Sequence, residues 1–144
     1  MKVQELLAAK SGKTVTIRPD STIDTAANLL KLEGIGALVV SDDGENVAGI
    51  LSERDIVRGL VDQGAHLLEA KVSELMTSSV KTCTAEDSIN DIMGEMTRSR
   101  IRHLPVLEGG KLSGIVSIGD VVKYRLEELQ TETNVLRDYI VGRS

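Results

Sequence analysis

Apolar positions recur along this chain in a pattern that occurs twice. In one stretch they are Ile23, Ala26, Ala27 and Leu30, and in the other Ile89, Ile92, Met93 and Met96. Both sets follow the i, i+3, i+4, i+7 spacing that places one apolar stripe on one helix face. The pattern therefore predicts two matching amphipathic helices.

Short apolar runs follow each predicted helix. They cover residues 37–40 and 47–51 after the first helix, and residues 103–106 and 112–116 after the second. Apolar runs joined by glycine-containing turns are typical of paired strands. With a leading strand before each helix, one unit is predicted as strand, helix, strand, strand, helix over about 50 residues. A unit so small buries little core, so we expect the two copies to pack against each other.

Composition narrows the possible partners. A net charge of −5 and an aromatic content of only two tyrosines argue against a nucleic-acid binder, which needs a basic surface. The single cysteine, Cys83, excludes an intramolecular disulfide. Lys10 and Gly12 interrupt the only early apolar run, and no run approaches the length of a membrane span. We therefore expect a cytoplasmic protein without a membrane partner.

Each repeat ends in the same short motif, an apolar strand followed by Ser-x-x-Asp. The motif spans residues 52–55 in the first copy and 117–120 in the second. A carboxylate there can accept hydrogen bonds from ribose hydroxyls, and the N-terminus of the following helix favours phosphate. The same spacing is also that of an ordinary helix-capping box. Spacing alone leaves both interpretations open.

These motifs, the order of elements and the segment 100–106 (Arg-Ile-Arg-His-Leu-Pro-Val) resemble a tandem pair of CBS domains, or Bateman module, over about residues 1–125. The small stand-alone bacterial CBS-pair proteins are the narrower likeness. The resemblance implies a mixed α/β (α+β) fold, in which two β-α-β-β-α motifs pack about a pseudo-two-fold axis and a helix follows. The expected ranges are 1–62, 63–125 and, for the C-terminal helical tail, 126–144.

The resemblance also implies a function. Clefts between such motifs bind adenosine-containing ligands, so the expected role is a regulatory module that senses AMP, ATP or NAD(H). No catalytic constellation is visible, so we expect no enzyme activity and no required cofactor. The alternative is an interaction module with degenerate clefts that docks on an enzyme or transporter.

Twelve positions match those that line the clefts in this family. They are Thr16, Ile17, Gly36, Ala37, Ser52, Arg54, Asp55, Thr82, Arg102, His103, Ser117 and Asp120. The resemblance makes Asp55 and Asp120 ribose ligands, places the serines near ribose or phosphate, and directs Arg102 and His103 at phosphate. The leading-strand residues would line the adenine pocket, in part through backbone groups.

The basic residues of the second repeat predict unequal clefts. Arg102 and His103 share a repeat with Asp120, whereas Gly36 and Ala37 stand at the matching places beside Asp55. The Asp120 cleft is therefore expected to be the stronger phosphate site. Clefts in this family draw on both repeats, so the alternative is that Arg102 serves the ligand held by Asp55.

Four other residues are interpreted structurally. Arg98 and Arg100 fit a solvated helix end with cations near its C-terminus, so they are not ranked as ligands. His66 is expected to be exposed between the repeats. Cys83 is expected to pack beside the pocket, because it has no partner for nucleophilic chemistry.

The C-terminal tail has its own periodicity. Apolar residues and one threonine follow a 4, 3, 4, 3, 4 spacing, at Val122, Leu126, Leu129, Thr133, Leu136 and Ile140. This is a short coiled-coil-like seam, which predicts a homodimer. Under three heptads is marginal for association alone, so a helix folded back on its own domain is an equal alternative.

Overall fold

Two three-stranded sheets and their helices form the protein, and the computed structural model describes residues 1–10 and 14–142. The first unit has β1 (Thr16–Ile17), α2 (Ile23–Glu33), β2 (Ala37–Val40), β3 (Gly49–Ser52) and α3 (Glu53–Gln63). The second has β4 (Cys83–Thr84), α5 (Ile89–Ser99), β5 (His103–Glu108), β6 (Lys111–Ser117) and α6 (Ile118–Ile140). The predicted order of elements and the mixed α/β class are confirmed.

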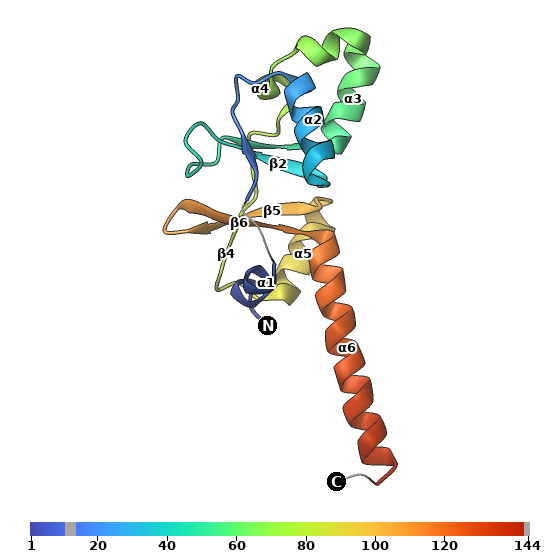
Figure 1. Ribbon diagram of the computed structural model, residues 1–144. Helices are drawn as coiled ribbons and strands as arrows, with labels where there is room; N and C mark the ends of the chain where they lie inside the picture. The colour runs from blue at the N-terminus through green and yellow to red at the C-terminus, as the bar shows by residue number, and fades with distance from the viewer. Residues whose placement is uncertain (11–13, 143–144) are drawn as a thin grey trace.

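The two sheets share one topology. In each sheet the leading strand runs parallel to the next, which pairs antiparallel with the third. The register pairs Ala37 with Ser52 in one sheet and His103 with Ser117 in the other. Figure 1 shows the sheets facing each other, with α2 and α3 outside one and α1 and α5 outside the other. The hairpin ends that carry these two residue pairs therefore lie at the junction of the two units.

Short helical segments accompany the main elements, and each packs on the unit formed mainly by the other sequence range. These are α1 (Val3–Ala9), the 3-10 helix η1 (Gly64–Glu69) and α4 (Val72–Leu75). The backbone N–H of Val3 donates to the Asp87 carbonyl at 2.9 Å, and that of Val72 donates to the Ser21 carbonyl at 2.8 Å. The exchange is reciprocal, as a pseudo-two-fold axis requires. The ranges 1–62 and 63–125 therefore describe repeats of sequence, while each spatial unit contains a helix from the other range.

The packing of the two cores follows this exchange. Leu67 and Val72 lie in the core of the first sheet, and Val3 and Leu6 lie in that of the second. Both cores are aliphatic apart from methionine and Cys83. Burial, with a smaller contribution from Asp87, raises the pKa of the Cys83 thiol to about 12. Cys83 is therefore a core residue with an unreactive thiol.

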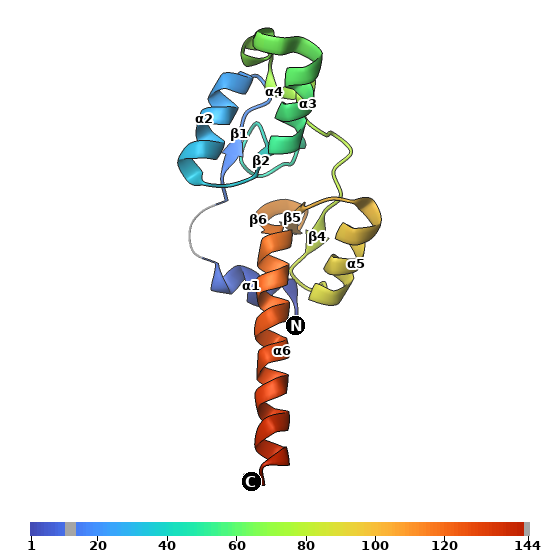
Figure 2. The same cartoon turned by 90° about the vertical axis from the view of Figure 1, so that its right-hand side faces the viewer.

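The closing helix of the second unit continues as the C-terminal tail. α6 runs without a break through residue 125, so the tail expected from 126 is the outer part of the same helix. Every residue from 129 to 142 is exposed, and Figures 1 and 2 show this part of α6 extending away from both units. The folded-back alternative is wrong for the described residues. Among these residues, no helix is both long enough and apolar enough to cross a membrane.

Candidate functional site

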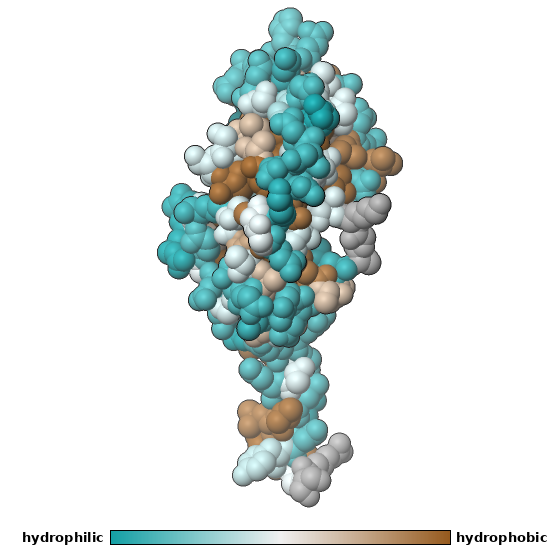
Figure 3. Space-filling model, turned by 90° about the vertical axis from the view of Figure 1, so that its left-hand side faces the viewer, coloured by the Kyte–Doolittle hydropathy of each residue, from teal (hydrophilic) through white to brown (hydrophobic). Residues whose placement is uncertain are grey.

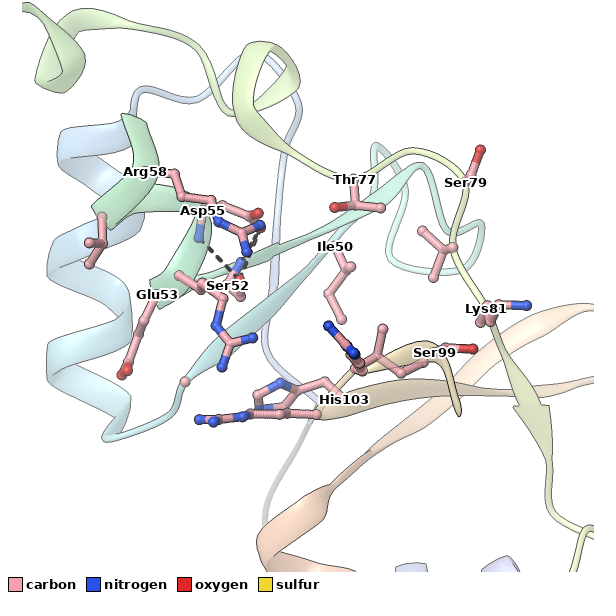
Figure 4. Close-up of a pocket in the computed structure, with 17 residues that line it drawn as sticks. Ile50, Ser52, Glu53, Asp55, Arg58, Thr77, Ser79, Lys81, Ser99 and His103 are labelled. Carbon is pink, nitrogen blue, oxygen red and sulfur yellow. Dashed lines mark hydrogen bonds between the residues drawn. The ribbon is translucent and has the colours of Figure 1, made fainter. Parts of the chain in front are cut away.

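A cleft of about 570 Å³ lies at the junction of the two units. It is lined by Gly36 and by residues from three segments, between positions 50 and 58, 77 and 81, and 99 and 103. Figure 4 shows Asp55 and Arg58 on α3, His103 on the facing strand, and Thr77, Ser79 and Lys81 along the connecting segment. The cleft thus draws side chains from both repeats and from their linker.

Asp55 stands at the first turn of α3, where the motif forms a capping box. Its Oδ2 accepts hydrogen bonds from the Ser52 backbone N–H at 2.9 Å and from the Ser52 hydroxyl at 3.0 Å. The Asp55 backbone N–H donates to the Ser52 hydroxyl at 3.3 Å. In the part of the chain that the structure describes, Oδ1 accepts no hydrogen bond. The capping and ligand interpretations are therefore compatible, because one oxygen caps the helix while the other faces the cleft region.

Asp120 has the same capping box but a different neighbour. Its Oδ2 accepts hydrogen bonds from the Ser117 backbone N–H at 3.0 Å and from the Lys10 ammonium at 2.7 Å. Lys10 also donates to the Ile115 carbonyl at 2.8 Å. Burial alone raises the pKa of Asp120, but the bonds from Lys10 and Ser117 outweigh it and hold that pKa below its usual value. The two aspartates are therefore equivalent in fold and unequal in charge environment.

Basic side chains gather on the Asp55 cleft. Its lining carries five cations, namely Arg54, Arg58, Lys81, Arg100 and Arg102, against two carboxylates, Glu53 and Asp55. Three of them, Arg54, Arg100 and Arg102, also line an adjoining hollow of about 290 Å³. Among the described residues the four arginines form no ion pair within 4.0 Å. A site with net charge of +3 on a protein of net charge −5 favours an anionic ligand.

Arg100 has a backbone conformation that is unfavourable for any residue with a side chain. It follows the end of α5 with φ +54°, in the left-handed region, whereas Gly34 has φ +64° at the matching end of α2. Among the described residues Arg100 is the only one other than glycine with positive φ. An L-residue there costs about 1–2 kcal/mol. Strained residues of this kind concentrate at functional sites, and the Arg100 side chain lines the cleft.

His103 lines the cleft near the carboxylates of Asp120 and Glu53. A Cβ placed on Gly36 would lie 3.5 Å from the His103 ring, so the ring faces Gly36 with room for a methyl group between them. Burial lowers the pKa of His103; Asp120 and Glu53 act in the opposite direction without cancelling burial. The ring is thereby biased toward its neutral form, which donates from one nitrogen and accepts at the other.

The structure brings six of the twelve predicted residues to this cleft. They are Gly36, Ser52, Arg54, Asp55, Arg102 and His103. Ser117 and Asp120 lie on the side of the molecule where Lys10 is bound. Arg102 lines the cleft of Asp55, which favours the alternative pairing over its expected pairing with Asp120 by shared repeat.

Four of the predicted residues, Thr16, Ile17, Ala37 and Thr82, are not among those that line this cleft. Ile17, Ala37 and Cys83 are buried, Thr16 is partly buried, and Thr82 is exposed beside the cleft-lining Lys81. The linker before β4 lines the cleft instead, because Thr77 bridges to Ile50 of β3.

Sequence reasoning missed several lining residues, including Arg58, Lys81 and Arg100. Arg58 could have been found, since it follows Arg54 by four positions and shares its helix face. The sequence predicts Arg100 only as a helix-end residue, because no residue near it in the sequence indicates its left-handed backbone conformation. Arg98 pairs with Glu95 at 3.0 Å, and His66 is exposed as expected, although within η1. No group of three His, Cys, Asp or Glu side chains in the described chain could hold a metal ion.

Comparison with known proteins identifies the architecture. The CBS domain pattern matches residues 9–62 and again residues 72–127. The chain belongs to the CBS-domain family. The solved structure of a CBS-domain containing protein from Agrobacterium tumefaciens is 45% identical, with a TM-score of 0.83 over 87% of this chain and 99% of that one. The doubled match confirms a tandem CBS pair.

Two further relatives differ in how much they share with this CBS pair. The mitochondrial CBS domain-containing protein CBSX3 of Arabidopsis thaliana is 39% identical over 127 residues, which are 85% of this chain and 62% of that protein. The CBS domain pair of protein MJ0100, solved with 5′-methylthioadenosine and S-adenosyl-L-methionine, is 22% identical. Its TM-score is 0.79, over 89% of this chain and 98% of that one. At that identity the likeness shows the fold alone.

Proposed function

We propose that this CBS pair is a cytoplasmic regulatory module that binds an adenine nucleotide in the Asp55 cleft and does not catalyse a reaction. One observation carries the proposal: a carboxylate at a helix N-terminus and four arginines, which form no ion pair with the described residues, converge on a single cleft of about 570 Å³. The carboxylate can accept hydrogen bonds from ribose hydroxyls, and the guanidinium groups can donate hydrogen bonds to phosphate oxygens.

The adenosine part is assigned to the Asp55 side of the cleft. The Asp55 Oδ1 can accept from vicinal ribose hydroxyls while Oδ2 keeps the helix cap. Apolar side chains of Ile50, Val80 and Ile101 line the same cleft and offer contact surface to a base.

The charge of the cleft favours a ligand with more than one phosphate. A phosphate monoester carries about −1.5 to −2 at neutral pH, and a second phosphate brings the total to about −3. The lining has a net charge of +3. We therefore place ADP and ATP ahead of AMP, and NAD(H), whose diphosphate is a diester with about one negative charge per phosphate, beside AMP. Arg54, Arg100 and Arg102 are the proposed phosphate ligands, because they line both the cleft and the adjoining hollow.

The second aspartate is proposed to be a weaker site. The Lys10 ammonium sits 2.7 Å from Oδ2 of Asp120, the oxygen that also caps the helix. Its positive charge neutralises the carboxylate, so Asp120 Oδ1 should accept hydrogen bonds from ribose hydroxyls more weakly than Asp55 Oδ1. We expect one nucleotide per chain at moderate ligand concentration.

Calorimetric titration with adenosine, AMP, ADP, ATP and NAD⁺ tests the proposal. We expect binding to tighten from adenosine to AMP to ADP and ATP, and GDP to bind more weakly than ADP. Asp55→Asn keeps the shape of the side chain and should weaken ADP binding about tenfold. Asp62→Asn removes a carboxylate from the same helix outside the cleft and should have little effect. If none of the adenine ligands binds at millimolar concentration, the proposal fails.

A docking module is the second candidate. Val57, Leu60 and Val61 leave apolar side chains exposed on α3, and exposed apolar surface favours a protein partner such as a regulated enzyme or transporter. Loss of all nucleotide binding in the titrations leaves this candidate in place. The functional form is proposed to be a homodimer in either case, because a regulatory module needs a surface through which to transmit its state.

A further inference from the structure

The outer half of α6 carries an apolar stripe that nothing in the described chain covers. Leu126 is 61% exposed, Leu136 59% and Ile140 71%, and every residue from 129 to 142 is exposed. Figure 3 shows an apolar patch near the end of this projecting helix. The twelve helical residues 129–140 extend for about 18 Å.

A helix of this length has little stability without a packing partner. Isolated helices shorter than about 12–15 residues are marginal in water, and helices in proteins are stabilised mainly by packing of an apolar face. We propose that the outer half of α6 pairs with the same segment of a second copy as a parallel two-stranded coiled coil. The proposal rests on the homodimer proposed above and is independent of nucleotide binding.

The heptad positions favour two strands. The 4, 3, 4, 3, 4 spacing puts Leu129 and Leu136 at d positions, and Leu126, Thr133 and Ile140 at a positions. Leucine at d with β-branched residues at a is the arrangement that favours dimers, and Thr133 and Ile140 fit it while Leu126 does not. The Thr133 hydroxyl already donates to the Leu129 carbonyl at 2.9 Å, so it can enter an apolar seam without an unpaired donor.

Charges beside the seam select the parallel orientation. In a parallel pair a g residue faces the e residue of the next heptad in the partner, which brings Glu132 against Arg137 of the other copy, twice by symmetry. The antiparallel register that keeps the whole seam instead brings Glu132 against Glu132 and Lys123 against Arg137. The parallel pair therefore has two attractive ion pairs between the helices, whereas the antiparallel pair places like charges opposite each other.

Charge reversal on the full chain tests both the surface and the orientation. Sedimentation analysis should give a dimer for the parent, and Glu132→Arg should weaken it about tenfold, or roughly 1.4 kcal/mol. Arg137→Glu should weaken a parallel dimer similarly, whereas it would strengthen the antiparallel one by facing Lys123. The double variant Glu132→Arg/Arg137→Glu restores the attraction and should recover the parent affinity. An equal mixture of the two single variants should form the mixed dimer preferentially.

Controls separate a lost contact from a lost helix. Glu132→Arg places arginine four residues after Glu128, which favours the helix, so circular dichroism should show no loss of helicity. Glu127→Arg makes the same charge change away from the seam and should leave the dimer intact. A monomeric parent overturns this proposal together with the homodimer. A dimer that both single reversals leave unchanged overturns the coiled coil alone, and one strengthened by Arg137→Glu overturns the parallel orientation.

Discussion

Replacing Arg100 by glycine should separate fold stability from ligand binding. Its left-handed φ of +54° costs an L-residue about 1–2 kcal/mol, which glycine avoids. Glycine also gives the unfolded chain more freedom, which offsets about 0.4–1 kcal/mol of that gain. The expected net effect is a more stable unliganded protein, by about 0.5 kcal/mol. Gly34, at φ +64° on the matching helix end, already has the unstrained arrangement.

The same change should weaken the ligand. A hydrogen bond to a charged group is worth about 1.5–3 kcal/mol. Because Arg100 is exposed, we take about 1.4 kcal/mol, which is tenfold in affinity. The loss should be larger for ADP than for adenosine, which has no phosphate to contact. Stability and affinity should therefore move in opposite directions, as expected where strain is held at a functional site.

Urea denaturation of the unliganded protein and calorimetric titration with ADP measure the two effects. Arg100→Ala loses the guanidinium but keeps the strain, so it should match Arg100→Gly in affinity and be less stable. Arg98→Gly lies within α5 and outside the cleft, and should destabilise by about 1 kcal/mol with little change in affinity. The reasoning is refuted if Arg100→Gly is as destabilising as Arg98→Gly, or if it binds ADP as tightly as the parent.

Three further changes probe other parts of the molecule. Lys10→Met removes the cation from Asp120, so the pKa of that carboxyl should rise and calorimetry should detect a second nucleotide per chain. Gly49→Ala would place a Cβ 2.8 Å from a backbone oxygen, so it should lower the free energy of unfolding by about 1–3 kcal/mol in urea. Burial holds the His103 pKa below 6.5, its value in the unfolded chain, so its contribution to stability is present above pH 6.5 and is lost as pH falls from there through the lower pKa of the folded protein. His103→Gln should reduce this loss in pH-dependent melts.

Each of these outcomes has a matched comparison. If the Lys10→Met variant still binds one nucleotide per chain, the ion pair is not what weakens the second site. Gly36→Ala, whose Cβ comes no nearer than 3.5 Å to another residue, should be tolerated where Gly49→Ala is not. His66→Gln alters the exposed histidine and should leave the pH dependence unchanged, and an equal effect of both histidine variants contradicts the burial argument.

Local structure followed directly from the sequence. The stripe of Ile89, Ile92 and Met96 lies buried on α5 as its spacing predicts, and both Ser-x-x-Asp motifs form capping boxes. Helix faces and caps depend on residues within one or two turns, so a local pattern is enough to specify them. The repeat likewise predicted two units sharing an interface.

Contacts between the units were decided only by tertiary packing. Arg102 lines one cleft with Asp55 of the other repeat, Lys10 pairs with Asp120, which is distant in sequence, and α1 completes the core of the second sheet. The strain at Arg100 also escaped the local pattern, since nothing beside it in sequence marks a left-handed turn. By itself the sequence determined the two motifs and the helix seam, because their periodicity lies within each segment. The pairing of basic side chains with one aspartate or the other depends on how two similar surfaces stack, which no single segment specifies.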